Sequence, residues 1–162
     1  MGSKSDVSSS ENGRDDEGCQ RLAIIVLRGD PIDAPQYRHT ALFIEHLNGS
    51  GRITQNRLMQ AVGSTGMFER DEATDRDPME SEVFAGRVTV ATIPVVSSSD
   101  TRLRDTIWST PVNNMEYDWN CQHWVGDALS ACAWAGLIST EEADEAIDGM
   151  TDLILQGQDS AA

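Results

Sequence analysis

Residues 38–47 constrain the fold more than any other stretch of this chain. Apolar side chains occupy consecutive positions from Ala41 to Ile44, so an extended strand here would be apolar on both faces. A strand of that kind is buried on both sides, which predicts a central position in a sheet. The chain must therefore provide neighbouring strands for it.

Three further segments have the composition of strands. Residues 21–28 contain the apolar run Leu-Ala-Ile-Ile-Val, residues 52–60 follow the turn 48–51 (Asn-Gly-Ser-Gly), and residues 88–95 lie between a glycine and a run of three serines. Short apolar runs bounded by turn residues are typical of strands. The turn predicts an antiparallel hairpin of 38–47 with 52–60.

The last third of the chain predicts helices. A short helix is expected over 100–109, a second from Cys121 to about Ala135, and a third after the capping-box pattern Ser139-x-x-Glu142. The third has one apolar face at helical spacing: Ala143, Ala146, Ile147, Met150, Leu153 and Ile154. Strands followed by helices indicate an α+β fold, here a small antiparallel sheet packed against helices with a C-terminal helical hairpin.

A single domain is expected over residues 21–157. Residues 1–20 are polar and acidic with almost no apolar content, which predicts a disordered tail, and residues 158–162 form a short C-terminal tail. Residues 69–82 hold seven acidic residues and two arginines without a regular period. This segment is predicted to be an exposed loop or a mobile insertion.

The charge of the chain excludes several classes of function. The formal net charge is -15 and no Lys or Arg follows Arg104, which disfavours nucleic acid and anionic membranes as partners. The one lysine, Lys4, lies in the predicted tail, so the domain has no P-loop or Schiff-base lysine. Three cysteines without a signal-like or membrane-length apolar segment predict reduced thiols in a cytoplasmic or nuclear protein.

Cys121 is the candidate nucleophile. It opens a predicted helix directly behind Asn120, a residue typical of helix N-caps. The positive end of the helix dipole favours the thiolate and lowers the pKa of a thiol in that position. The alternative is a buried structural cysteine, because free Cys is among the most buried residue types. Cys132, three turns further on the same face, is expected to be structural.

Three histidines compete for the role of base. His123 follows Cys121 by two positions, about 200° around a helix, so it is expected to point away from the thiol. His46 ends the strand 38–47 beside a turn and is expected to be solvated. His39 begins the same strand and is the candidate base, against the alternative of a structural strand histidine.

Two segments resemble known families of thiol enzymes. The pentad Asn120-Cys121-Gln122-His123-Trp124 resembles the Asn-Cys-Glu-His-Phe motif of lecithin:retinol acyltransferase-like proteins. It also resembles the Asn-Cys-Asn-x-Phe motif of PPPDE-type deubiquitinating and deSUMOylating peptidases. Residues 39–44, followed by a glycine-containing hairpin, are similar to the histidine strand of both groups. These groups share a papain-like fold with the bacterial NlpC-type peptidases, in circularly permuted order, and the resemblance covers roughly residues 21–135.

The resemblance implies a permuted papain-like fold and a thiol hydrolase or acyltransferase. Cys121 would attack an amide, ester or thioester, and His39 would transfer the proton. A third polar residue, from the strand after the hairpin, orients the histidine in these families, and Gln55 and Gln60 are the candidates here. A glutamine can hold the imidazole but has no charge to stabilise the imidazolium.

The same resemblance suggests how an oxyanion would be held. The backbone N–H of Cys121, behind its cap Asn120, would donate to it, together with a polar group from 113–118. No metal or cofactor is implied, because the histidines and cysteines lack the spacing of a tetrahedral site. The expected partner is a small-molecule acyl substrate or a peptide, with a homodimer contact if the apolar stripe of the last helix is not covered.

Two alternatives to this function stay open. One keeps the fold but acts as a thiol peptidase on ubiquitin-like conjugates, for which the acidic surface would suit a basic partner. The other is a binding protein that keeps the scaffold without catalysis, with Cys121 as a relic. The lack of a charged third residue favours the second alternative.

Overall fold

The strand expected over residues 38–47 is the middle strand of a five-stranded sheet. The computed structural model describes residues 18–157, and within them every neighbouring pair of strands is antiparallel. The strands occur in the order β4-β3-β2-β1-β5. They are β1 (Cys19–Leu27), β2 (His39–Leu47), β3 (Ile53–Val62), β4 (Glu69–Thr74) and β5 (Phe84–Pro94). The prediction of a central strand and of a β2–β3 hairpin is confirmed.

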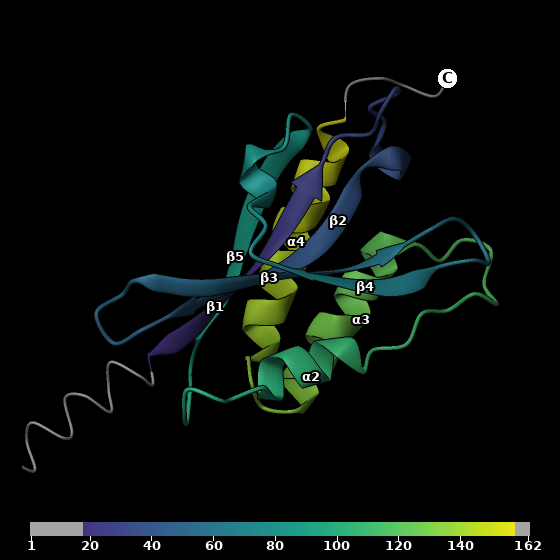
Figure 1. Ribbon diagram of the computed structural model, residues 1–162. Helices are drawn as coiled ribbons and strands as arrows, with labels where there is room; N and C mark the ends of the chain where they lie inside the picture. Colours follow the sequence, from purple (N-terminus) through teal and green to yellow (C-terminus); the bar gives the residue numbers. More distant parts are fainter. Residues whose placement is uncertain (1–17, 158–162) are drawn as a thin grey trace, which may run out of the picture.

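Three helices follow the sheet in the described part of the chain (Figure 1). They are α2 (Arg102–Trp108), α3 (Cys121–Trp134) and α4 (Thr140–Leu155); two short 3₁₀ turns are η1 (Pro35–Tyr37) and η2 (Pro78–Glu80). Helix α3 packs on β2 and β3, α4 packs on β5 and β1, and α2 contacts α3. The fold is therefore α+β, as the order of strand and helix patterns predicted.

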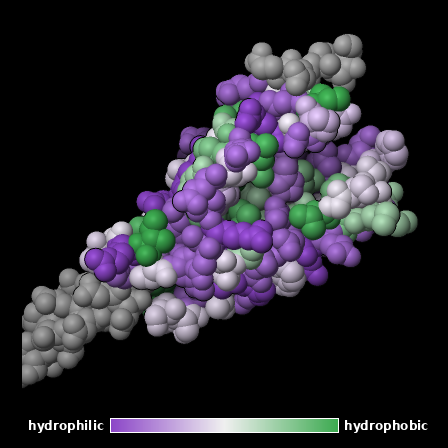
Figure 2. Space-filling view, turned by 45° about the horizontal axis from the view of Figure 1, so that its top comes forward, coloured by the Kyte–Doolittle hydropathy of each residue, from purple (hydrophilic) through white to green (hydrophobic). Residues whose placement is uncertain are grey.

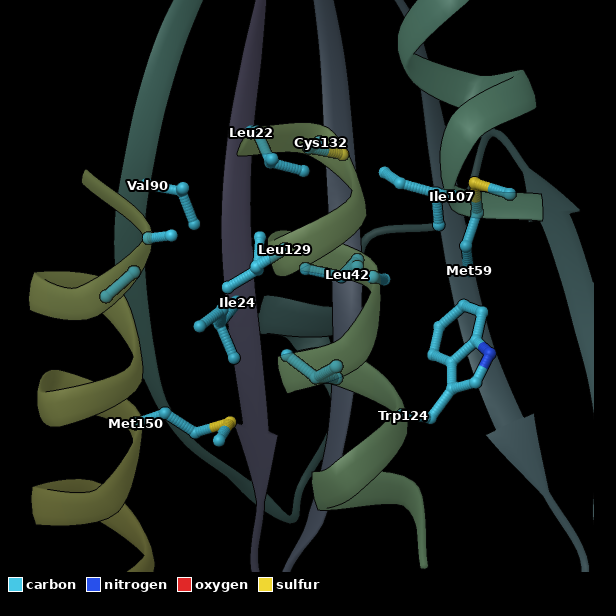
Figure 3. Close-up of a cluster of buried hydrophobic side chains, with 14 of the residues drawn as sticks. Leu22, Ile24, Leu42, Met59, Val90, Ile107, Trp124, Leu129, Cys132 and Met150 are labelled. Atoms are coloured by element: carbon cyan, nitrogen blue, oxygen red, sulfur yellow. The ribbon is translucent and has the colours of Figure 1, made fainter. Parts of the chain in front are cut away.

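The core lies between the sheet and the helices (Figure 3). Side chains at alternate positions of the central strands face the helices, as the period of an extended strand requires. Leu22 and Ile24 of β1 and Leu42 of β2 are fully buried there against Leu129 of α3. Each such side chain contributes about 1.5–3 kcal/mol by leaving water.

The apolar stripe of α4 is covered by the domain itself. Ala146, Met150 and Ile154 are buried in the core, which confirms the predicted face. Strand β5 begins at Phe84, before the expected residue 88, because its pairing with β1 extends as far as Leu27. Gly86 lies inside the strand, where a Cβ would come within 2.7 Å of the Leu153 side chain. Because the stripe is covered, it no longer gives a reason to expect a homodimer contact through α4.

The prediction of a loop over residues 69–82 was wrong for its first half. Glu69–Thr74 form β4, an edge strand paired with β3. Charged side chains are tolerated on an edge strand, where they also discourage pairing with other chains, so no apolar alternation was visible. Arg70 stacks on the ring of Trp108, and Glu72 forms ion pairs with Arg57 and Arg104. These contacts fix β4 to β3 and α2.

Glu72 gives a testable contribution to stability. The hydrogen bonds of Arg104, and those of Arg57, lower the pKa of Glu72 from 4.5 to about 2, although burial acts in the opposite direction. A carboxylate whose pKa is depressed in the folded protein stabilises it above the unfolded pKa, and that contribution is lost as the pH falls through the folded value. Glu72→Gln is therefore expected to lower the free energy of unfolding by about 1–3 kcal/mol at pH 7.

Urea unfolding of both proteins at pH 7 and at pH 3.5 measures this effect. The difference in the free energy of unfolding between wild type and Glu72→Gln should be smaller at pH 3.5, because the wild-type carboxylate is then largely protonated in the unfolded state but still ionised in the folded state. Glu80→Gln, at an exposed carboxylate of η2, is the matched control and should change stability by less than about 0.5 kcal/mol. Equal losses at both pH values would show that Glu72 acts through packing instead.

The ends of the described chain differ slightly from the expected domain. Cys19 and Gln20, which had been assigned to the N-terminal tail, are the first residues of β1. The remainder of that predicted tail up to residue 17, and residues 158–162, lie outside the described residues.

No helix within 18–157 is long and apolar enough to cross a membrane. The face in Figure 2 is mainly hydrophilic, with hydrophobic side chains in small separate patches.

Candidate functional site

The N-terminus of α3 is fixed by a reciprocal cap. The Asn120 side chain accepts a hydrogen bond from the backbone N–H of Gln122 (2.9 Å), and the backbone N–H of Asn120 donates to Nδ1 of His123 (3.2 Å). This is the capping-box arrangement with histidine in the place usually taken by Glu or Gln. His123 is exposed and serves the cap, so it is not the partner of the thiol.

Cys121 is the first residue of α3, and its side chain lies among groups that favour the thiolate. Burial raises the pKa of the Cys121 thiol, but the hydrogen bond and the charge of His39 lower it, as do the backbone N–H and the hydroxyl of Thr40. The net effect is a lowered pKa. The Thr40 hydroxyl is fully buried and has no hydrogen-bond partner of normal geometry among the described residues. A thiolate at Cys121 would give it an acceptor.

Cys132 provides an internal comparison for Cys121. Both are buried on the same face of α3. At Cys132 burial acts without a neighbouring base and raises the pKa of the thiol to about 12. The lowered pKa of Cys121 therefore comes from His39 and Thr40, and not from a general property of thiols in this core.

His39 begins β2 and is held between Cys121 and Gln60. Its Nε2 lies 2.6 Å from Oε1 of Gln60. Burial lowers the pKa of His39, but the hydrogen bond and charge of Cys121 and the hydrogen bond of Gln60 raise it, and the net effect is a raised pKa. Because Nε2 is engaged by Gln60, Nδ1 is the ring nitrogen left for the thiol. A lowered thiol pKa beside a raised imidazole pKa favours a thiolate–imidazolium pair.

Of the two candidate glutamines, only Gln60 reaches His39. Gln55 is exposed and lies opposite His46, at the other end of the β2–β3 hairpin. Gln60 also donates from Nε2 to the carboxylate of Asp71 on β4, over 3.0 Å. The third position of the site is therefore occupied by Gln60.

The loop before His39 is tied to both neighbouring helices. Nε2 of Gln122 donates to the backbone carbonyls of Pro35 (3.1 Å) and Arg38 (3.0 Å), which joins the second residue of α3 to this loop. Arg38 is buried, forms a paired contact with the carboxylate of Asp33 and donates to the carbonyl of Leu153 near the end of α4 (2.7 Å). These contacts fix the position at which β2, and with it His39, begins.

Gln122 and Thr40 were not identified from the sequence. Gln122 occupies the position at which the acyltransferase motif has Glu. Its adjacency to Cys121 and its amide, which can donate to carbonyls, are the signals that were available. Thr40 follows His39 directly, and a hydroxyl beside a candidate base is a comparable signal.

Cys121 and His39 open into a cleft of about 340 Å³. Its walls come from the loop before β2, the end of β3 and the start of α3: Gln36, Tyr37, Arg38, His39, Ala61, Val62, Gly63, Phe68, Asn120 and Cys121. The backbone N–H of Cys121 donates to no other group in the described chain, because the first N–H groups of a helix have no intrahelical acceptor. A substrate carbonyl in the cleft could accept from it.

The expected second oxyanion donor from 113–118 is not at the site. The side chain of Asn113 accepts from the backbone of Met115 and Glu116, and the amide of Asn114 is engaged with the backbone of Phe68 at both ends. Asparagine readily closes turns of its own backbone, and these contacts hold the loop against the β3–β4 hairpin. Asn120 is the asparagine that lines the cleft.

Residues 29–139 match the family of unknown function DUF6540. The chain belongs to this family. The DUF6540 region begins in the loop before His39 and ends just before α4, so it contains His39, Gln60, Asp71 and Cys121. No curated protein and no solved structure matches the chain.

His46, also within the DUF6540 region, is not the solvated turn residue that was expected. It is half-buried, its Nδ1 lies 3.3 Å from Nε2 of Gln20, and its Nε2 is buried without a partner among the described residues. Burial and the charge of Arg57 lower the pKa of His46. At about 3.3 Å per residue it lies roughly 23 Å along β2 from His39, so it takes no part in the thiol site.

The described part of the DUF6540 chain has no grouping of His, Cys, Asp or Glu that would hold a metal ion. Within residues 18–157, no three of these side chains are placed so that they could bind one ion together. The groups that converge on the cleft are a thiol, an imidazole, an amide and backbone N–H donors. That donor set suits nucleophilic acyl chemistry.

Proposed function

We propose that the chain is a cysteine-dependent hydrolase or acyltransferase that acts on an amide, ester or thioester. The observation that carries this proposal is the pairing of Cys121 with His39 in an open cleft, with the pKa of the thiol lowered and that of the imidazole raised. A perturbed nucleophile–base pair in a cleft is the arrangement that covalent catalysis requires.

The proposal includes a permuted papain-like fold. It is supported by a nucleophilic cysteine at the N-terminus of α3, which packs on the antiparallel strands that carry the histidine and its orienting amide. The histidine precedes the cysteine in the chain, which is the order of the acyltransferase-like and PPPDE-type groups. The pentad that begins at Asn120 adds the resemblance in sequence.

In the first half of the reaction, the Cys121 thiolate would attack the substrate carbonyl carbon. The carbonyl oxygen would become an oxyanion that accepts from the free N–H of Cys121, with the amide NH₂ of Asn120 as the second donor that we assign. The bond to the leaving amine, alkoxide or thiolate would then break as the carbonyl re-forms. The His39 imidazolium would protonate that leaving group and become neutral.

In the second half, neutral His39 would act as a general base. Water or another acceptor would lose a proton to Nδ1 and attack the thioester formed on Cys121. Collapse of the second tetrahedral intermediate would release the acid or the acylated acceptor and return the thiolate–imidazolium pair. Gln60 would keep the ring in one orientation through both halves, since it holds Nε2 throughout.

Alkylation of the purified protein tests the nucleophile. With limiting iodoacetamide at pH 6.5 and peptide mapping by mass spectrometry, Cys121 should react at least about tenfold faster than Cys19, because His39 and Thr40 lower the pKa of the Cys121 thiol and the thiolate is the reactive form. Cys132 should be nearly inert, since burial raises its pKa to about 12. In Cys121→Ser the fast-reacting thiol should be absent.

Probes then distinguish the alternative functions. A fast Cys121 that reacts with acyl ester or thioester probes supports the hydrolase or acyltransferase, whereas selective reaction with ubiquitin-like vinyl electrophiles would identify a peptidase of such conjugates. If Cys121 reacts no faster than Cys19, the catalytic proposal fails and a binding protein with a relic thiol becomes the better description.

A further inference from the structure

Gln60 is held at both ends of its side-chain amide. Its Oε1 lies 2.6 Å from Nε2 of His39, and its Nε2 donates to a carboxylate oxygen of Asp71 over 3.0 Å. The two strands are in register at this point, with Gln60 of β3 directly opposite Asp71 of β4. Thus Asp71, from the edge strand that the sequence did not predict, is connected to the thiol site.

The chemistry of these groups fixes the direction of each hydrogen bond. An ionised carboxylate can only accept, so it holds the NH₂ end of the Gln60 amide and turns the carbonyl oxygen toward His39. A carbonyl oxygen can also only accept, so Nε2 of His39 must carry a proton. In the neutral ring the proton is then absent from Nδ1, which is the nitrogen left to receive the thiol proton of Cys121.

We propose that Asp71 is a positioning residue that sets the tautomer of His39 through Gln60. This inference rests on the proposed function, since it assigns Asp71 to the same Cys121–His39 site. Without the carboxylate, the Gln60 amide could rotate by 180° and present its NH₂ group to Nε2. That orientation favours the neutral ring protonated on Nδ1, which cannot accept a proton from the thiol.

Asp71 also provides the charge that Gln60 lacks. When the thiolate–imidazolium pair forms, both ring nitrogens donate, and Oε1 of Gln60 remains a good acceptor. The carboxylate polarises the amide between them and so stabilises the positive ring from the far side of Gln60. Asp71 contacts Gln60, and Gln60 contacts His39, so the effect of the carboxylate on the ring passes through the amide. No proton moves to Asp71.

The tautomer can be measured directly. In a Cys121→Ser background, which removes the ion pair, ¹⁵N–¹H correlation spectra of histidine-labelled protein distinguish Nε2–H from Nδ1–H rings. His39 should be the Nε2–H tautomer, and adding Asp71→Asn should produce a substantial Nδ1–H population. Asp71→Glu, which keeps an acceptor-only group, should retain Nε2–H. A ring that stays entirely Nε2–H in Asp71→Asn overturns the inference.

The pH profile of Cys121 alkylation is the second measurement, made on the full-length protein with the thiol intact. Asp71→Asn should slow the reaction at pH 6.5 by about three- to tenfold and move its midpoint to higher pH, because up to one pKa unit corresponds to a tenfold change. Asp71→Glu should recover most of the rate. Glu69→Gln, which removes an exposed carboxylate from the same strand without a contact to Gln60, should stay within twofold of wild type.

The two measurements separate this inference from the proposed function. A fast Cys121 in wild type with an unchanged profile and tautomer in Asp71→Asn overturns the role of Asp71 alone. Slow alkylation of Cys121 in wild type overturns the proposed function. In that case the tautomer of His39 in Asp71→Asn still tests whether Asp71 orients the ring. Thermal unfolding by circular dichroism confirms that each variant is folded, so a loss of rate cannot be ascribed to loss of the fold.

Discussion

Replacement of His39 by alanine is expected to slow the alkylation of Cys121 at pH 6.5 by at least about tenfold. The pKa of the thiol is lowered by the hydrogen bond and charge of His39, against the opposing effect of burial. Without the imidazole, burial acts with less opposition and the thiol returns at least to its ordinary range, where about 1% is ionised at pH 6.5. Any turnover of an acyl substrate should fall by at least a similar factor, since the general base is lost as well.

The pH dependence of the alkylation rate distinguishes wild type from His39→Ala most clearly. In wild type the thiolate is favoured by the imidazolium, so reactivity should persist at pH values well below those at which ordinary thiols become unreactive. In His39→Ala the rate should rise with pH as for a thiol without a base, and the two rates should approach each other only above the ordinary thiol pKa of about 8.5. The measurement is the alkylation rate from pH 4.5 to 10, with mass-spectrometric assignment of the labelled residue.

His46→Gln is the matched control for His39→Ala. Both histidines lie on β2, at its opposite ends, and His46 has no contact with the thiol. The control should therefore leave the alkylation profile of Cys121 unchanged, while thermal unfolding reports any effect on the fold. A His39→Ala protein that alkylates as fast as wild type at pH 6.5 would remove the base from the proposed mechanism.

Most of the helices and strands could be predicted from the sequence, because their burial leaves a pattern of apolar residues. Strands β1 and β2 are buried on both faces, so their apolar runs are continuous. Helix α4 has one buried face and a capping box, so spacing and cap agree. Edge strand β4 has neither signal, because its side chains are satisfied by ion pairs and stacking instead of burial. Its existence depends on contacts with β3 and α2, which a local pattern does not contain.

Some residues of the candidate site could be predicted from the sequence, and others could not. Cys121 could be identified because it lies at a predicted helix start, within the pentad that resembles known families. His39 could be identified because it begins a predicted strand. The choice of Gln60 over Gln55 could also have been derived from the register of the hairpin. An antiparallel hairpin that pairs Leu42 with Met59 brings Gln60 near the start of β2, where His39 lies. The proposed role of Asp71 could not be predicted from the sequence, because it depends on the pairing of β4 with β3, and residues 69–74 had no strand signal.

The largest effect on stability is expected for Trp124→Ala, at about 3–5 kcal/mol. The Trp124 side chain is fully buried and extends from α3 toward Met59 and Ile107 (Figure 3). Its Nε1–H donates to the backbone carbonyl of Thr110 over 3.0 Å. The substitution therefore leaves a large cavity between α3, α2 and the sheet, and it also leaves a buried carbonyl without that donor.

Two further variants separate these causes. Trp124→Phe keeps most of the ring volume but loses the N–H, so it should cost about 1–2 kcal/mol, mainly from the unsatisfied carbonyl of Thr110. Trp134→Ala is the matched control, because Trp134 ends the same helix with its side chain 94% exposed, and it should change stability by less than about 0.5 kcal/mol. Urea unfolding followed by circular dichroism at 222 nm measures all three without relying on tryptophan fluorescence. If Trp134→Ala destabilised the protein as much as Trp124→Ala, the packing of α3 on the sheet would have to be the reverse of the one described, with Cys121 turned away from His39.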